Sequence, residues 1–149
     1  MRKLILAIAV ALPLFAQERV TLCRRKATIE REQLADLQAA RRTLRAELAR
    51  TPTLDVVADE VATVEEELGE PGAAAQALVT CLSEHPDGSD VLGNRREVLE
   101  RVARLLDDAG DPEAALDRLL EGADLGRLSR QAELRRARLA EQLERPDIA

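Results

Sequence analysis

The residues of this chain that could do chemistry are mostly carboxylates, and some of them stand next to each other in its middle part. Glu66-Glu67 and Asp107-Asp108 are such pairs. Paired acids attract Ca²⁺ loosely, but neighbouring side chains on a helix point in different directions. They do not form the cage of roughly six to eight oxygens that this cation takes. We therefore expect no metal site at these positions.

Groups suited to catalysis are scarce. The single histidine, His85, precedes Pro86 at the expected end of a helix, where an imidazole suits the helix dipole and the last carbonyl groups. The sequence has no nucleophile elbow, no glycine loop of the kind that cradles phosphate and no histidine-containing metal triad. We expect a protein that is not an enzyme, with no catalytic residues, no cofactor and no metal.

Two cysteines, Cys23 and Cys81, allow one disulfide. In an oxidising compartment this bond would close a loop of nearly sixty residues and stabilise the fold by about 4 kcal/mol. The alternative is that Cys81 is a small core residue and Cys23 a thiol in a mobile N-terminus. Without neighbouring Cys or His, two cysteines are too few for a structural zinc site, which takes about four ligands.

The first sixteen residues have the pattern of a secretory signal peptide. Arg2 and Lys3 precede an apolar run over 4–16, and Gln-Glu-Arg follows at once. The run is shorter than the roughly 20 residues that span a bilayer. The pattern predicts a signal over 1–16 with cleavage after Ala16, so we expect export to the bacterial periplasm and no stable membrane anchor afterwards. The alternative is an amphipathic or core helix.

The charge of the mature chain limits its partners. Removal of Arg2 and Lys3 leaves 20 of the 22 basic residues against 28 acidic ones, a net charge of −8. This balance argues against nucleic acid or an anionic membrane as a partner. The only aromatic residue, Phe15, lies in the signal, so stacking on sugars or bases is excluded as well.

Apolar residues recur with helical spacing almost throughout, which predicts an all-α protein. We expect a mobile N-terminus over 17–27, a long amphipathic helix over 28–50, a helical domain over 53–144 that ends in a solvating helix, and a tail over 145–149. The long helix carries an apolar stripe that could pack on the domain or on a copy of itself. The stripe consists of Ile29, Leu34, Leu37, Ala40, Leu44 and Leu48.

The helical domain contains the same turn twice. Gly69 and Gly110 each stand two residues before a proline, Pro71 and Pro112, and an alanine-rich run follows. Glycine ends one helix in a left-handed cap, and proline suits the first turn of the next. A further helix start is indicated by Asn94, because a Glu three residues later completes the spacing of a capping box.

These turns and the small residues around them resemble the tetratricopeptide repeat, a helix hairpin of 34 residues. The matching residues are Ala62, Ala74, Leu78 and Pro86 in a first copy over 55–88, and Ala103, Ala115 and Leu119 in a second over 96–129. Some residues depart from the pattern of the family. Arg127 stands in place of the closing proline, Ala58 and Leu99 in place of an aromatic residue, and Glu65 in place of the usual Tyr. The interval from Gly69 to Gly110 is 41 residues, seven more than one repeat. The resemblance implies stacked antiparallel hairpins in a short solenoid; the alternative is a plain helical bundle.

In that family the first helix of each repeat lines a concave groove for peptides. The carried-over groove positions are Val56, Asp59, Thr63, Glu66 and Glu67, then Glu97, Glu100, Arg104, Asp107 and Asp108. Seven of these ten are carboxylates and one is basic. This is the opposite of the carboxylate-clamp repeats of the family, which hold the C-terminal tail of a chaperone with Lys, Arg and Asn. The resemblance therefore implies a scaffold for protein–protein interaction whose groove takes a basic peptide or helix, expected to come from an envelope protein.

Charge is also divided along the chain. Residues 54–124 hold 19 acidic and 5 basic side chains, whereas residues 24–50 hold 8 basic and 4 acidic ones and residues 125–149 hold 6 and 4. The acidic middle segment is expected to lie against basic groups. These could belong to a partner protein or to the chain's own arginine-rich ends, within one chain or across a homodimer. The alternative function is a structural homo-oligomer of the envelope that pairs through the helix over 28–50. The acidic run could also be no more than a solvated face.

Overall fold

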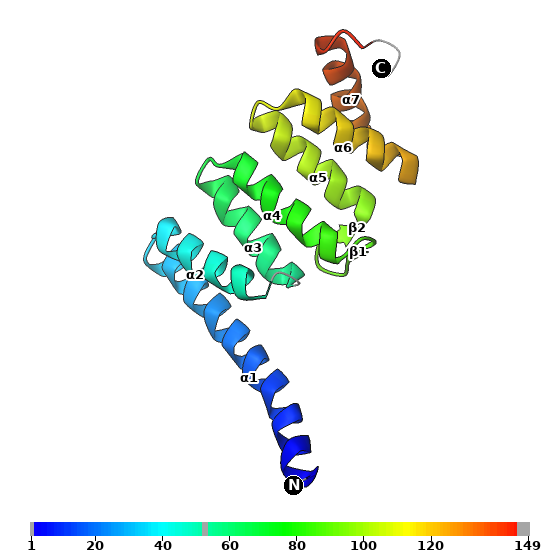
Figure 1. Cartoon of the computed structure of the whole chain (residues 1–149). Helices are drawn as coiled ribbons and strands as arrows, with labels where there is room; N and C mark the ends of the chain where they lie inside the picture. The colour runs from blue at the N-terminus through cyan, green and yellow to red at the C-terminus, as the bar shows by residue number, and fades with distance from the viewer. Residues whose placement is uncertain (1, 52–53, 146–149) are drawn as a thin grey trace. The chain divides into compact units, whose positions relative to one another are not determined.

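A computed structural model describes residues 2–51 and 54–145, with side chains described from residue 15 onward. The chain divides into an N-terminal unit, Met1–Arg50, and a C-terminal unit, Thr51–Ala149 (Figure 1). Both units are built from helices, so the all-α prediction is confirmed.

The N-terminal unit is a helix hairpin. Helix α1 (Arg2–Thr28) runs into a π-helical turn (Ile29–Gln33), and α2 (Leu37–Arg50) follows. The prediction of one helix over 28–50 is wrong, because the chain reverses at Ala35, whose φ is 50°. Asp36 caps the start of α2. Its Oδ1 accepts a hydrogen bond from the backbone N–H of Ala39 at 2.8 Å, and so gives a partner to one of the N–H groups of the first turn that have none within the helix.

The hairpin changes the expected role of this region. Residues 17–27, expected to be mobile, are helical in the structure. Helix α2 packs on α1, and Ala40 and Leu44 of the predicted apolar stripe are buried. These two residues are therefore not available for self-pairing through one long helix over 28–50.

The predicted signal peptide falls inside α1, which continues without a break past Ala16. Among the described residues, none of the helices has both the length and the hydropathy needed to cross a membrane. Signal cleavage and export stay predictions.

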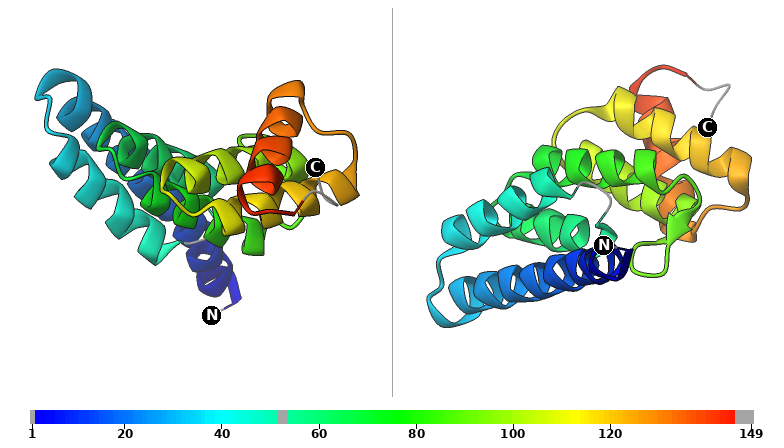
Figure 2. Two further views of the ribbon diagram at one scale, coloured as in Figure 1. Left: turned by 90° about the horizontal axis from the view of Figure 1, so that it is seen from above. Right: turned by 60° about the horizontal axis from the view of Figure 1, so that its bottom comes forward.

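The C-terminal unit stacks two helix hairpins and a final helix. Its elements are α3 (Asp55–Glu67), α4 (Pro71–Glu84), β1 (Gly88–Ser89), β2 (Gly93–Asn94), α5 (Arg95–Asp108), α6 (Pro112–Leu125) and α7 (Arg130–Gln142). Helix α3 packs on α4, α4 on α5, α5 on α6 and α6 on α7, as Figures 1 and 2 show for this unit. The short tetratricopeptide-like solenoid predicted from the sequence is confirmed. Residues 52, 53 and 146–149, which include Pro52 and most of the predicted tail, lie outside the described residues.

Both predicted glycine-proline turns are present. Gly69 and Gly110 have φ of 76° and 81°, in the left-handed region that residues other than glycine rarely adopt. Pro71 and Pro112 occupy the first position of α4 and α6. The backbone alone thus fixes where each hairpin turns.

The seven extra residues between these turns are explained by the connection from α4 to α5. It contains the antiparallel pair of β1 and β2 and ends in the predicted capping box. The backbone N–H of Glu97 donates to Oδ1 of Asn94 at 3.1 Å, and the backbone N–H of Asn94 donates to Oε2 of Glu97 at 3.0 Å. An insertion in a connection lengthens the repeat and leaves the stacked helices intact.

Small residues hold the helices of each hairpin close together. The four predicted crossing residues, Ala62, Ala74, Ala103 and Ala115, are all 0% exposed. Leucines fill the spaces around them, among them Leu78 and Leu119, which are also 0% exposed. The core of this unit is aliphatic, and burial of its leucine side chains contributes roughly 1.5–3 kcal/mol each.

The turn geometry predicts different effects of alanine at two neighbouring glycines. Gly69→Ala should lower the free energy of unfolding by about 1 kcal/mol, because a Cβ there meets no atom within 4 Å but the left-handed backbone is strained. Gly72→Ala, in the first turn of α4 with only Ala109 nearby at 3.6 Å, should be neutral or stabilising. Urea unfolding of both variants checks this; equal losses would contradict it.

Candidate protein-binding face

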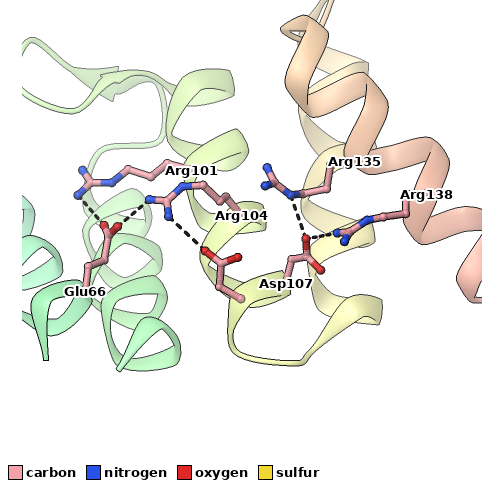
Figure 3. A network of polar contacts seen from close by, with 7 residues as sticks. Glu66, Arg101, Arg104, Asp107, Arg135 and Arg138 are labelled. Atoms are coloured by element: carbon pink, nitrogen blue, oxygen red, sulfur yellow. Dashed lines mark hydrogen bonds and ion pairs between the residues drawn. The ribbon is translucent and has the colours of Figure 1, made fainter. Parts of the chain in front are cut away.

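One side of the C-terminal unit carries polar side chains from α3, α5 and α7 that are joined by ion pairs (Figure 3); we call it the α3–α5–α7 face. Arg101 and Arg104 of α5 both bind Glu66 in the last turn of α3, with Nη2 to Oε1 at 3.2 Å for Arg101 and Nη2 to Oε2 at 2.8 Å for Arg104. Arg101 also binds Asp59 of α3. We call the two arginines on Glu66 the first arginine clamp.

A second arginine clamp joins α5 to α7. Nε of Arg135 lies 3.0 Å from Oδ2 of Asp107, and Arg138 binds the same oxygen (Figure 3). Asp107 is near the end of α5, as Glu66 is near the end of α3. The same device therefore ties each of these helices to the next one on the face.

The sequence intervals show that the clamps are equivalent. In each clamp the arginines are three residues apart, and the second pair follows the first by 34 residues, the length of one tetratricopeptide repeat. The two carboxylates are 41 residues apart, like the two turn glycines. Helix α7, expected only to solvate the end of the domain, thus also stands where the first helix of a third repeat would stand.

The first clamp favours the charged state of Glu66 and of Arg101. Burial raises the pKa of Glu66, but the hydrogen bonds from Arg104 and Arg101 together outweigh it, so the pKa lies below its usual value. For Arg101, burial lowers the pKa, and the carboxylates of Asp59 and Glu66 raise it above its usual value. Glu66 and Arg101 each stabilise the charge of the other, so both are charged at neutral pH.

The structure places all ten carried-over groove positions, Val56 among them, in α3 or α5. The ion-pair network includes Asp59, Glu66, Arg104, Asp107 and Asp108, the last bound by Arg104 at 3.3 Å.

The other four polar groove residues have separate surroundings. Glu97 belongs to the capping box, and Glu100 accepts a hydrogen bond from the backbone N–H of Ser129 at 3.0 Å. The Thr63 hydroxyl donates to the backbone carbonyl of Asp59 at 2.9 Å, and Glu67 is exposed at the end of α3. The predicted set thus includes the carboxylates of both clamps, Glu66 and Asp107, and the role of the set in binding stays a prediction.

Sequence reasoning missed the arginines that meet these carboxylates. Arg101, Arg135 and Arg138 lie outside the carried-over positions, and so does Arg96, which lies 3.8 Å from Glu100. With Arg104, five guanidinium groups pair with five of the seven predicted carboxylates, and Glu67 and Glu97 make up the difference in number. The face keeps an excess of carboxylates, but a smaller one than the groove positions alone indicate. The repeated arginine pair was the signal that could have shown this.

A cleft of about 390 Å³ opens beside the second clamp. It lies between α5 and α7 and is lined by Asp107, Asp108, Gln131, Leu134, Arg135 and Arg138. Leu134 is 63% exposed. The cleft thus offers an apolar side chain surrounded by charges that already have partners on the face.

The two cysteines are both thiols in the structure. Burial raises the pKa of Cys81 to about 11, so its thiol is inert as a nucleophile at neutral pH. Sγ of Cys23 contacts the backbone carbonyl of Thr43 at 3.5 Å. The cysteines belong to different units, and the Cys23–Cys81 disulfide stays a prediction.

The N-terminal unit has its own groove, of about 350 Å³, between α1 and α2. Its main ion pair joins Arg19 to the buried Glu47 at 2.9 Å, and Lys26 binds Glu30 at 2.8 Å and the hydroxyl of Thr43 at 2.7 Å. These contacts close the hairpin, so we assign them a structural role. Over the described part of the chain, no group of three or more His, Cys, Asp and Glu side chains is placed to hold a metal ion.

The first clamp predicts a pH-dependent stability. Glu66→Gln should lower the free energy of unfolding by about 1 kcal/mol at pH 7. Because the pKa of Glu66 is lower in the folded chain, its contribution is complete above about pH 4.3 and is lost as pH falls through the folded-state value. The difference between wild type and variant should therefore shrink on acidification. Urea unfolding at several pH values checks this, with Asp117→Asn on the exposed side of α6 as control; a constant difference would contradict it.

Comparisons with known proteins agree with this fold. No family model matches the chain, and no curated protein matches it. The crystal structure of MamA, a tetratricopeptide-like protein, is similar, with a TM-score of 0.61 over 79% of this chain and 14% identity. The match covers 65% of the MamA chain, and at this identity it concerns the fold alone.

Proposed function

We propose that this protein is a non-enzymatic scaffold that binds a basic peptide or helix of another protein on its α3–α5–α7 face. The observation that carries the proposal is the excess of carboxylates over arginines on that face. The excess gives the face a negative potential, which steers a basic segment toward it and orients the segment on arrival.

Binding of a basic segment proceeds in competition with the chain's own arginines. Asp108 is half exposed and Glu67 is exposed, so a ligand's ammonium or guanidinium group reaches them without opening the core. Asp107 is 15% exposed and held by two arginines. A ligand therefore contacts the exposed carboxylates first, and the affinity is moderate and sensitive to salt, because exposed ion pairs are weak and screened.

We further propose that the scaffold acts outside the cytoplasm, in the periplasm of a bacterial envelope. The support is the pattern of Arg2 and Lys3 followed by the apolar run over 4–16. The partner would then be another envelope protein with a basic segment.

A fluorescein-labelled octalysine peptide tests the proposed binding. We expect it to bind the full chain at low salt, with affinity lost toward about 0.5 M salt, and an octaglutamate peptide to bind far more weakly. The double variant Glu67→Gln, Asp108→Asn should lower the affinity by about threefold or more, measured by fluorescence anisotropy.

The matched control removes two carboxylates elsewhere. Asp117→Asn, Asp124→Asn changes the net charge equally at exposed positions of α6. If both double variants lose the same affinity, attraction is a property of the net charge, and the α3–α5–α7 face is not the binding site. No binding of octalysine at low salt would refute the proposed function.

A further inference from the structure

We infer that the cleft between α5 and α7 receives an apolar side chain of the same partner, so that the segment recognised by this protein combines basic residues with an apolar anchor. This inference rests on the proposed function and specifies its ligand. The partner it fits is a short peptide or helix in which leucine, isoleucine, valine or methionine stands beside a run of lysine or arginine.

The first support is where Leu134 lies on the face. It follows Glu100 by 34 residues, and the second arginine pair follows the first by the same interval, so Leu134 in α7 stands where Glu100 stands in α5. At this position the face changes from a carboxylate to an apolar side chain. Leu134 is 63% exposed, so its side chain is open to a ligand.

The second support is the cleft around that leucine. The cleft measures about 390 Å³, and besides Leu134 it is lined by Gln131 and charged side chains. The cleft is shallow and open to solvent, and its volume leaves room for an aliphatic side chain. A leucine that is alone among polar groups gains little from its own chain, whereas a ligand side chain in the cleft would cover it from water.

The third support is the charge balance at the rim. Asp107 is bound by Arg135 and Arg138, and Asp108 by Arg104. The cleft therefore holds as many lining arginines as lining carboxylates and selects little by charge. Selection for basic residues comes from the rest of the face, where Glu67 is exposed at the end of α3. The basic residues and the apolar residue of the ligand are thus recognised at different places on the face.

Two pairs of labelled peptides test this inference on the full chain. In the first pair, one peptide has four lysines followed by two glycines and two leucines, and the other has two serines in place of the leucines. The second pair has the same residues in the reverse order, so that both directions of binding are tested. In at least one order we expect the leucine peptide to bind about tenfold more tightly than the serine peptide. Fluorescence anisotropy gives both affinities.

Two variants locate the effect. Leu134→Gln should abolish the preference for leucine and leave the affinity for the serine peptide unchanged, since no charge is altered. Leu125→Gln is the matched control, because Leu125 is 54% exposed at the end of α6 and does not line the cleft. It should keep the full preference. Circular dichroism of both variants confirms that α7 and α6 remain folded.

The possible outcomes separate the inference from the proposed function. If both peptides bind with equal affinity in both orders, or if Leu125→Gln removes the preference as Leu134→Gln does, the apolar anchor is refuted and basic recognition stands. If neither peptide binds, the proposed function fails. If Leu134→Gln changes self-association in sedimentation and not peptide binding, the cleft is a contact with a second copy and the inference is wrong.

Discussion

The α3–α5–α7 face depends on one interaction that occurs twice. Two arginines three residues apart bind a single carboxylate near the end of the preceding helix in the series α3, α5, α7. Glu66 is held in this way by α5, and Asp107 by α7. Such partly exposed ion pairs contribute little to stability, which comes from the aliphatic core. Their effect is to fix the direction of long side chains on neighbouring helices, and so to decide which charges a partner meets.

This arrangement gives the face a graded chemistry. A row of carboxylates without the clamps would attract any cation, and a fully matched row would attract none. Here both clamps hold paired charges, and those of the second clamp line the cleft beside Leu134; Glu67 is exposed at the end of α3. Under the proposed function, the basic groups and the apolar group of a ligand would be recognised at different points of the face. Charge complementarity contributes specificity and association rate more than affinity, and burial of an apolar side chain beside it would add binding energy.

Sequence reasoning succeeded where the signal was local. The turns at Gly69 and Gly110, the capping box at Asn94 and the small residues at the helix crossings each need only a few neighbouring residues, and all are found in the structure. It failed where distant residues decide. The reversal at Ala35 has no glycine or proline to mark it, and good helix formers surround it, so local propensity indicated one long helix. The arginines of the clamps lie more than 25 residues from their carboxylates in the sequence. Only the repeated spacing of the arginines could have shown that α7 follows α3 and α5 on the same face.

The most direct test of the account is a nuclear magnetic resonance titration of the ¹⁵N-labelled full chain with the lysine-leucine peptide. If α3, α5 and α7 together form the recognition surface, the shift changes will gather on the exposed side of these helices. They will include Glu67, Asp108 and Leu134, and they will leave the outer residues of α6 unaffected. Changes centred on α4 or α6, or spread evenly over the acidic residues of the chain, would show that this face is not where partners bind.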